Sequence, residues 1–156
     1  MFTMRFRWAA IFVAALCASP SQAESLYFSL SGRKVSVFLD RVSQNDVMVL
    51  TGQVPRSGTG EISHVVRFTA PSNEMRATIT WNIYNRTRFV GVNVDLTTSD
   101  GALVGSDAFT GTLATRAAVS TLDVSSLTPN QVYILKVSGV QTSGLNYSIA
   151  IEFGPP

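Results

Sequence analysis

Three aspartates of this chain, Asp95, Asp100 and Asp107, lie close together in sequence around one Asp-Gly turn. Carboxylate oxygens and loop carbonyls are the ligands that Ca²⁺ prefers, about six to eight at a time. Calcium is therefore the one cofactor that the sequence suggests, with these three residues as candidate metal ligands. Their spacing matches no EF-hand loop, and aspartates are common in turns because their side chains bond to the local backbone. A solvated turn without metal is the simpler interpretation.

Candidates for catalysis are few. His64 is the one histidine of the chain, and a histidine base needs a nucleophile and an orienting acid beside it. No Gly-x-Ser-x-Gly sequence is present, so the nucleophile motif of the α/β-hydrolases is missing. A carboxylate pair for glycoside hydrolysis, such as Asp95 with Asp107, stays open. We predict that the protein is not an enzyme and has no catalytic residues; a small secreted hydrolase is the second alternative.

Aromatic side chains on a sheet face could stack on sugars. Trp81 shares its alternating face with Ile79, which is typical of a core residue. Tyr84, Phe89 and Phe109 lie outside the clean apolar faces. They are the candidates for an exposed binding surface.

The elements that must position these residues are strands. Apolar residues alternate with polar ones and no helical period occurs, which indicates an all-β fold. Residues 99–101 (Ser-Asp-Gly) predict a tight hairpin turn, and residues 108–118 read as a long loop or edge segment. About nine strands in one domain imply a single antiparallel β-sandwich. The expected strands are residues 26–30, 35–39, 47–54, 62–69, 75–83, 90–96, 119–124, 132–137 and 145–153.

The first 23 residues resemble a cleavable signal peptide. Arg5 and Arg7 precede an apolar run over 8–18 that is shorter than the roughly 20 residues needed to span a bilayer. Small residues precede the predicted cleavage between Ala23 and Glu24. We therefore expect a periplasmic or secreted protein, with residues 1–23 as the signal peptide, residues 24–156 as one β-sandwich domain and no transmembrane segment in the mature chain.

Charge and cysteine content exclude further classes. Removing Arg5 and Arg7 leaves 10 basic residues against 10 acidic ones, since the whole chain has 12 and 10. A neutral chain has no basic field for nucleic acid. The one cysteine, Cys17, lies in the predicted leader, and Leu16 before it is too large for a lipoprotein signal. The mature chain then has no disulfide, thiol nucleophile or thiolate metal site.

From about residue 62 to 153 the chain resembles the bacterial pre-peptidase C-terminal domain. The resemblance rests on the order of residues 66–71 (VRFTAP), 94–106 with their Asp-Leu and Asp-Gly, 127–133 (LTPNQVY) and 147–149 (YSI). It implies a jelly-roll-like β-sandwich that is auxiliary to other proteins, aids secretion, folding or attachment to a polymer, and in some members binds calcium. No catalytic domain precedes these residues, and residues 24–60 add strands, so we expect the module to stand alone.

These observations predict an exported, non-catalytic β-sandwich module for binding or assembly in the bacterial envelope or extracellular space. Its expected partner is an envelope protein or a polysaccharide, held by sheet faces, loops or edge strands. The alternative is a calcium-dependent carbohydrate-binding or adhesin domain.

Overall fold

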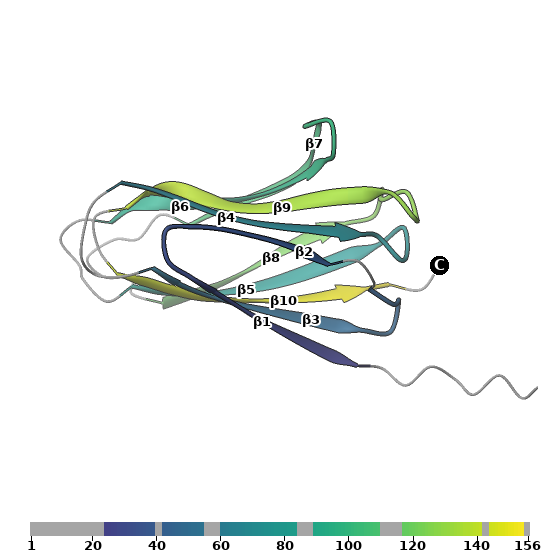
Figure 1. Cartoon of the computed structure of the whole chain (residues 1–156), viewed down its shortest axis with the longest axis horizontal. Helices are drawn as coiled ribbons and strands as arrows, with labels where there is room; N and C mark the ends of the chain where they lie inside the picture. The colour runs from purple at the N-terminus through teal and green to yellow at the C-terminus, as the bar shows by residue number, and fades with distance from the viewer. Residues whose placement is uncertain are drawn as a thin grey trace, which may run out of the picture.

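The chain folds as two stacked β-sheets in a computed structural model, which describes residues 24–39, 42–54, 60–83, 89–109, 117–141 and 144–154 (Figure 1). The predicted signal peptide, residues 1–23, lies outside these ranges. Within them, no helix is long and apolar enough to cross a membrane. The described ranges contain the strands β1 (Ser25–Ser31), β2 (Lys34–Leu39), β3 (Val47–Val54), β4 (Gly60–Thr69), β5 (Met75–Ile83), β6 (Phe89–Thr98), β7 (Leu103–Phe109), β8 (Ala117–Val124), β9 (Val132–Gln141) and β10 (Leu145–Phe153).

Each layer of the sandwich holds five strands. The first sheet has the order β1-β3-β10-β5-β8, and the second has the order β2-β4-β9-β6-β7. The predicted all-β sandwich is confirmed, although the described residues form one strand more than the nine expected. Successive strands often change sheet, as β1 to β2 and β3 to β4 do, so the chain joins the two layers repeatedly (Figure 1).

The expectation of purely antiparallel pairing is wrong at one side of the sandwich. β1 pairs with β3, and β2 with β4, both in parallel. Parallel neighbours need a crossover connection. Here the opposite sheet provides it, because the chain passes through β2 between β1 and β3, and through β3 between β2 and β4.

Alternating side chains fill the space between the sheets. In β10, which lies at the centre of the first sheet, every second residue is buried: Leu145, Tyr147, Ile149, Ile151 and Phe153. Trp81 of β5 is fully buried, so its predicted core position is confirmed. The burial of such large apolar side chains is the main stabilising term in a fold of this kind.

The strand missing from the sequence-based prediction is β7, which forms a hairpin with β6. The predicted turn is confirmed, since Thr98 N donates to Ala102 O at 2.9 Å and Gly101 has φ 94°. β7 contains glycine and aspartate, which are poor strand formers. Gly105 suits its position because a Cβ there would lie 3.1 Å from the side chains of Leu122 and Val124.

Candidate functional site

The single histidine is a buried bridge between the two sheets. His64 of β4 is 1% exposed, and its Nδ1 lies 2.5 Å from Oη of Tyr147 on β10. Its Nε2 lies 3.0 Å from the carbonyl oxygen of Gly32. A carbonyl can only accept, so Nε2 carries the proton and Nδ1 accepts from the tyrosine hydroxyl. Burial lowers the pKa of His64 and raises that of Tyr147. This imidazole is neutral, fully engaged and out of reach of a substrate.

Aromatic rings continue this interior cluster. The ring of Trp81 stacks on Phe109 at 5.5 Å between centroids with 7° between the planes, and lies 5.6 Å from the ring of Tyr147. Phe109 is 7% exposed. Its prediction as part of an exposed binding surface is therefore wrong, because β7 directs this ring into the core. Tyr84 and the side chain of Phe89 lie outside what the structure describes, so their exposure stays a prediction.

The three aspartates of the predicted calcium site do not face one another. Asp95 is opposite Lys136 and Ser106 on the outer face of the second sheet. Asp107 is opposite Val94, whose side chain is fully buried, and its own Oδ2 is buried without a hydrogen-bond partner. Cross-strand partners share a face, so Asp95 and Asp107 lie on opposite faces of one sheet. They cannot act as a carboxylate pair on one substrate.

Asp100 lies apart from the other two, in the β6–β7 turn. Oγ1 of Thr98 donates to its carboxylate, which lowers the pKa of Asp100. Over the described ranges, no group of three or more His, Cys, Asp or Glu side chains could hold a metal ion. The residues present do not fit a calcium site made of all three aspartates, and calcium binding by other means stays a prediction.

The outer face of the first sheet gathers polar side chains into rows. Strand register fixes these rows, because residues directly opposite one another on neighbouring strands point to the same side. The charged row contains Glu152, Arg76 and Asp123, with Ser25 and Val47; the middle row Tyr27, Val49, Ala150, Thr78 and Thr121; the hydroxyl row Ser29, Thr51, Ser148 and Thr80, with the exposed Val119 at its β8 end; and the amide row Gln53, Asn146 and Asn82, with Ser31 and Ala117 at its ends.

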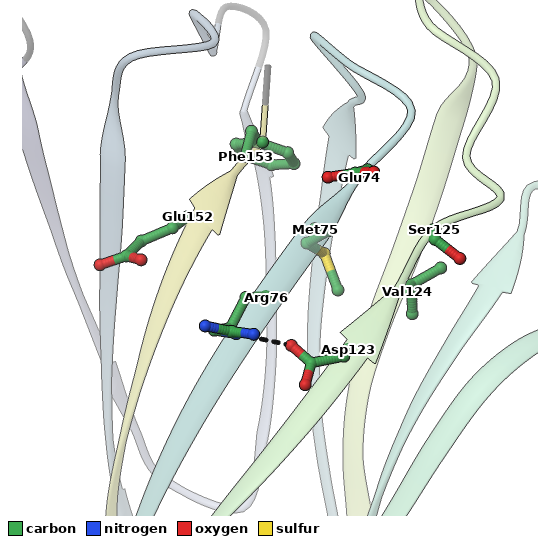
Figure 2. A pocket seen from close by; sticks show the side chains of 9 residues that line it. Glu74, Met75, Arg76, Asp123, Val124, Ser125, Glu152 and Phe153 are labelled. Carbon is green, nitrogen blue, oxygen red and sulfur yellow. Dashed lines mark hydrogen bonds and ion pairs between the residues drawn. The ribbon is translucent and has the colours of Figure 1, made fainter. Parts of the chain in front are cut away.

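The charged row borders an open groove of about 490 Å³ at one end of this face (Figure 2). Arg76 Nε donates to Asp123 Oδ1 at 2.7 Å, and both side chains are more than half exposed. Figure 2 shows the guanidinium of Arg76 directed toward Asp123, while Glu74 and Glu152 lie at the groove on neighbouring segments. Three carboxylates against one guanidinium make this end of the face acidic.

A second groove, of about 380 Å³, lies over the hydroxyl and amide rows. Ser29, Thr51 and Thr80 line it together with Gln53 and Asn82. The remaining lining residues are also uncharged: Gly52, Asn146, Tyr147 and Ser148. This groove can offer many neutral hydrogen-bond donors and acceptors but no ion pair.

Neither groove was identified from the sequence. Alternation does assign Arg76, Thr78 and Thr80 to one face of their strand, and Ser148 and Glu152 to one face of another. What alternation cannot give is the neighbour of each strand. β10 lies between β3 and β5 although about 60 residues separate it from β5. The rows can therefore be assigned only once the strand order and register are known.

Comparisons with known proteins yield structures alone. No family model matches the chain, and no curated protein matches it. Among solved structures, the pre-peptidase C-terminal domain of a collagenase from Bacillus anthracis is 9% identical, with 76% of this chain and 96% of that one covered and a TM-score of 0.45. The periplasmic inhibitor of g-type lysozyme from Aeromonas hydrophila is 13% identical, with 78% and 97% covered and a TM-score of 0.40.

A third similar structure is a Stig cyclase from Fischerella sp. TAU, which is 13% identical with a TM-score of 0.43. The match covers 62% of this chain and 59% of the cyclase, so the chain spans about three fifths of that protein. The collagenase domain among these matches is of the kind that residues 62–153 resemble in sequence.

Proposed function

We propose that this protein is an exported, non-catalytic β-sandwich module of the bacterial envelope or extracellular space, and that it holds its partner on the outer face of the first sheet. The observation that carries the proposal is the set of polar rows on that face. They run across neighbouring strands and lead from one groove into the next. Such a surface of polar side chains interspersed with apolar ones, built on strands whose backbone is fixed by the ladder, is suited to binding.

The chemistry of the described residues supports a role in binding over one in catalysis. His64, the one histidine, is enclosed between the sheets and bonded at both nitrogens. Asp95 and Asp107, the pair considered for glycoside hydrolysis, lie on opposite faces of the second sheet. General acid–base catalysis requires its groups to reach the reacting atoms. The enclosed His64 cannot do so, and Asp95 and Asp107 cannot do so together. Export rests on the signal-like sequence of residues 1–23.

Two matched substitutions test the proposed face. Ser148 lies on the central strand of the first sheet and Ser138 on the central strand of the second; both are partly buried and both point outward. Ser148→Arg should place a long charged side chain in the middle of the proposed face, while Ser138→Arg makes the same change on the opposite surface. The immobilised protein is incubated with native envelope extract, and retained proteins and polysaccharides are identified.

We expect the unmodified protein and Ser138→Arg to retain the same component, and Ser148→Arg to lose it. Thermal melting of all three proteins checks that each is folded. If Ser138→Arg alone loses the component, binding belongs to the second sheet. Equal retention by all three proteins would place binding at the edges or loops. Either result contradicts the proposed face.

A further inference from the structure

We infer that the groove over the hydroxyl and amide rows is a binding site for an uncharged polysaccharide, with Tyr27 as the platform for one sugar ring. This inference rests on the proposed function and names its ligand class. It places the sugar-binding site on the first sheet, whereas the aspartates of the predicted calcium site lie on the second sheet. It also makes recognition independent of calcium.

The lining of the groove matches the chemistry of a neutral sugar polymer. Each hydroxyl can donate one hydrogen bond and accept two, and each side-chain amide offers two donors and an acceptor. Sugar hydroxyls have the same mixed character, so they can donate to some side chains of the rows and accept from others; Thr51, whose hydrogen is directed at Phe28 O, can only accept. Carboxylate and phosphate ligands are instead met by Arg or Lys. No Arg or Lys is among the residues that line this groove.

The hydroxyl side chains of the lining are short, and two of them are restrained. Thr51 and Thr80 are β-branched, so few χ1 rotamers are open to them on a strand. Oγ1 of Thr51 donates to the carbonyl oxygen of Phe28 at 3.3 Å, which holds one hydroxyl of the row in place. Groups that are ordered before binding lose little entropy when the ligand arrives. The two threonine hydroxyls of the row are therefore preorganised for binding.

Tyr27 supplies the apolar part that sugar binding requires. It lies on the edge strand β1, two residues before Ser29 and on the same outer face, and its side chain is 73% exposed. A tyrosine ring is a large apolar plate with a polar tip, and the C–H face of a pyranose can pack on it. Successive residues on one face are roughly 7 Å apart along a strand, so Tyr27 borders the hydroxyl row.

Charge at the far end of the face favours a neutral polymer over an anionic one. The charged row holds Glu152 and Asp123 against Arg76, and Glu74 adds a third carboxylate to that groove. Among the described residues, the guanidinium of Arg76 forms its ion pair with Asp123, and Glu74 and Glu152 form none. A chain of sugar carboxylates running along the strands would meet this negative charge and be repelled. An uncharged polymer meets no such repulsion.

Affinity electrophoresis of the protein tests the inference with defined polymers. The gels contain one neutral polysaccharide each, a linear β-glucan, a xyloglucan or glycol chitin, with alginate as an anionic comparison. Two variants remove one hydroxyl each at constant shape, Thr51→Val and Thr80→Val, and Tyr27→Ala removes the ring. Their matched controls lie on the outer face of the second sheet: Thr97→Val on β6, and Phe38→Ala, whose ring is 55% exposed on the edge strand β2.

We expect retardation by at least one neutral polymer, no retardation by alginate, and no change when a chelator is added. Each hydroxyl deletion should weaken binding about three- to tenfold, as expected for one neutral hydrogen bond. Tyr27→Ala should weaken binding at least tenfold, and the two control variants should bind like the unmodified protein.

Three results would overturn the inference. Retardation that the controls abolish, or that the groove variants leave unchanged, would place the sugar site elsewhere. Loss of retardation when a chelator is added would show that sugar binding depends on a metal ion. Absence of retardation in every neutral gel, with retention of an envelope protein that Ser148→Arg abolishes, would show that the face binds a protein; the proposed function would then stand while the glycan assignment falls.

Discussion

The hydroxyl oxygen of Tyr147 lies 2.5 Å from Nδ1 of His64, and this bond joins the central strand of one sheet to the other sheet through the core. The tyrosine is 4% exposed and the histidine 1%. Nε2 of the same ring donates to Gly32 O, in the connection between β1 and β2. One side chain therefore ties together both layers and the N-terminal strands.

Removal of the Tyr147 hydroxyl should show how much this hydrogen bond contributes to the free energy of unfolding. In Tyr147→Phe the buried Nδ1 of His64 is left without a donor, which typically costs about 1–3 kcal/mol. We expect the free energy of unfolding, from urea denaturation, to fall by that amount. Tyr27→Phe removes a hydroxyl from a ring that is 73% exposed and should change stability by less than about 0.5 kcal/mol. Equal effects of the two changes would contradict the bridge.

Stability should decline as the pH falls below 6.5. Burial lowers the pKa of His64 from 6.5, so the unfolded chain gains a proton in a range where the folded chain does not. The contribution of the neutral imidazole is fully present above pH 6.5 and is lost progressively between 6.5 and the folded-state pKa, with a slope of at most about 1.4 kcal/mol per pH unit. Urea denaturation at pH 7.5, 6.5 and 5.5 measures the slope. His64→Gln, which cannot titrate, should show a flatter dependence over this range.

Gly52 should tolerate no side chain. It lies directly opposite Tyr147, and a Cβ there would fall 2.0 Å from Cε1 and Cζ of that ring. Because the ring is fixed by His64 and by its neighbour Trp81, Gly52→Ala should destabilise the protein by about 3 kcal/mol or more, as overpacking in a full core does. Gly105→Ala, whose Cβ would contact two flexible side chains at 3.1 Å, should cost clearly less. Thermal melting of the two variants shows which of them is the more destabilised; equal melting temperatures would contradict this prediction.

Calcium should leave the melting temperature unchanged. A ligand that binds only the folded state raises this temperature, but Asp95, Asp100 and Asp107 do not converge on one point. Melting curves in millimolar calcium and in chelator should therefore coincide. A rise in calcium that Asp95→Asn and Asp107→Asn abolish would contradict this expectation and restore the metal site.

Much of the fold could be predicted because side-chain alternation is a local property of the chain. Leu145 to Phe153 and Met75 to Ile83 read as strands with one apolar face, and the structure has them so. β7 was missed because Gly105, Ser106 and Asp107 interrupt the apolar pattern. The parallel pairing of β1 with β3 and of β2 with β4 does not follow from the sequence, because no local pattern states which strand is a neighbour.

The predicted calcium site, which includes Asp95 and Asp107, does not form for a more specific reason. An irregularity between Leu96 and Thr97 shifts the register of the β6–β7 hairpin by one residue. Such a shift turns every following side chain to the other face. Without it, Asp95 and Asp107 would point the same way, as their spacing suggests. One extra residue in the hairpin therefore places the two carboxylates on opposite faces, and the sequence alone does not reveal this irregularity.

The central place of β10 bears on the order in which the molecule can form. This strand is the last one among the described residues and lies between β3 and β5, so both of those strands keep an unpaired edge until β10 pairs with them. A chain made from its N-terminus cannot complete the first sheet before residues 145–153 have emerged. Contacts between segments so distant in sequence are slow to form, and loss of this last strand would leave two open edges available to other chains. The first sheet should therefore be completed late in synthesis, and a chaperone that covers free strand edges would protect β3 and β5 until then.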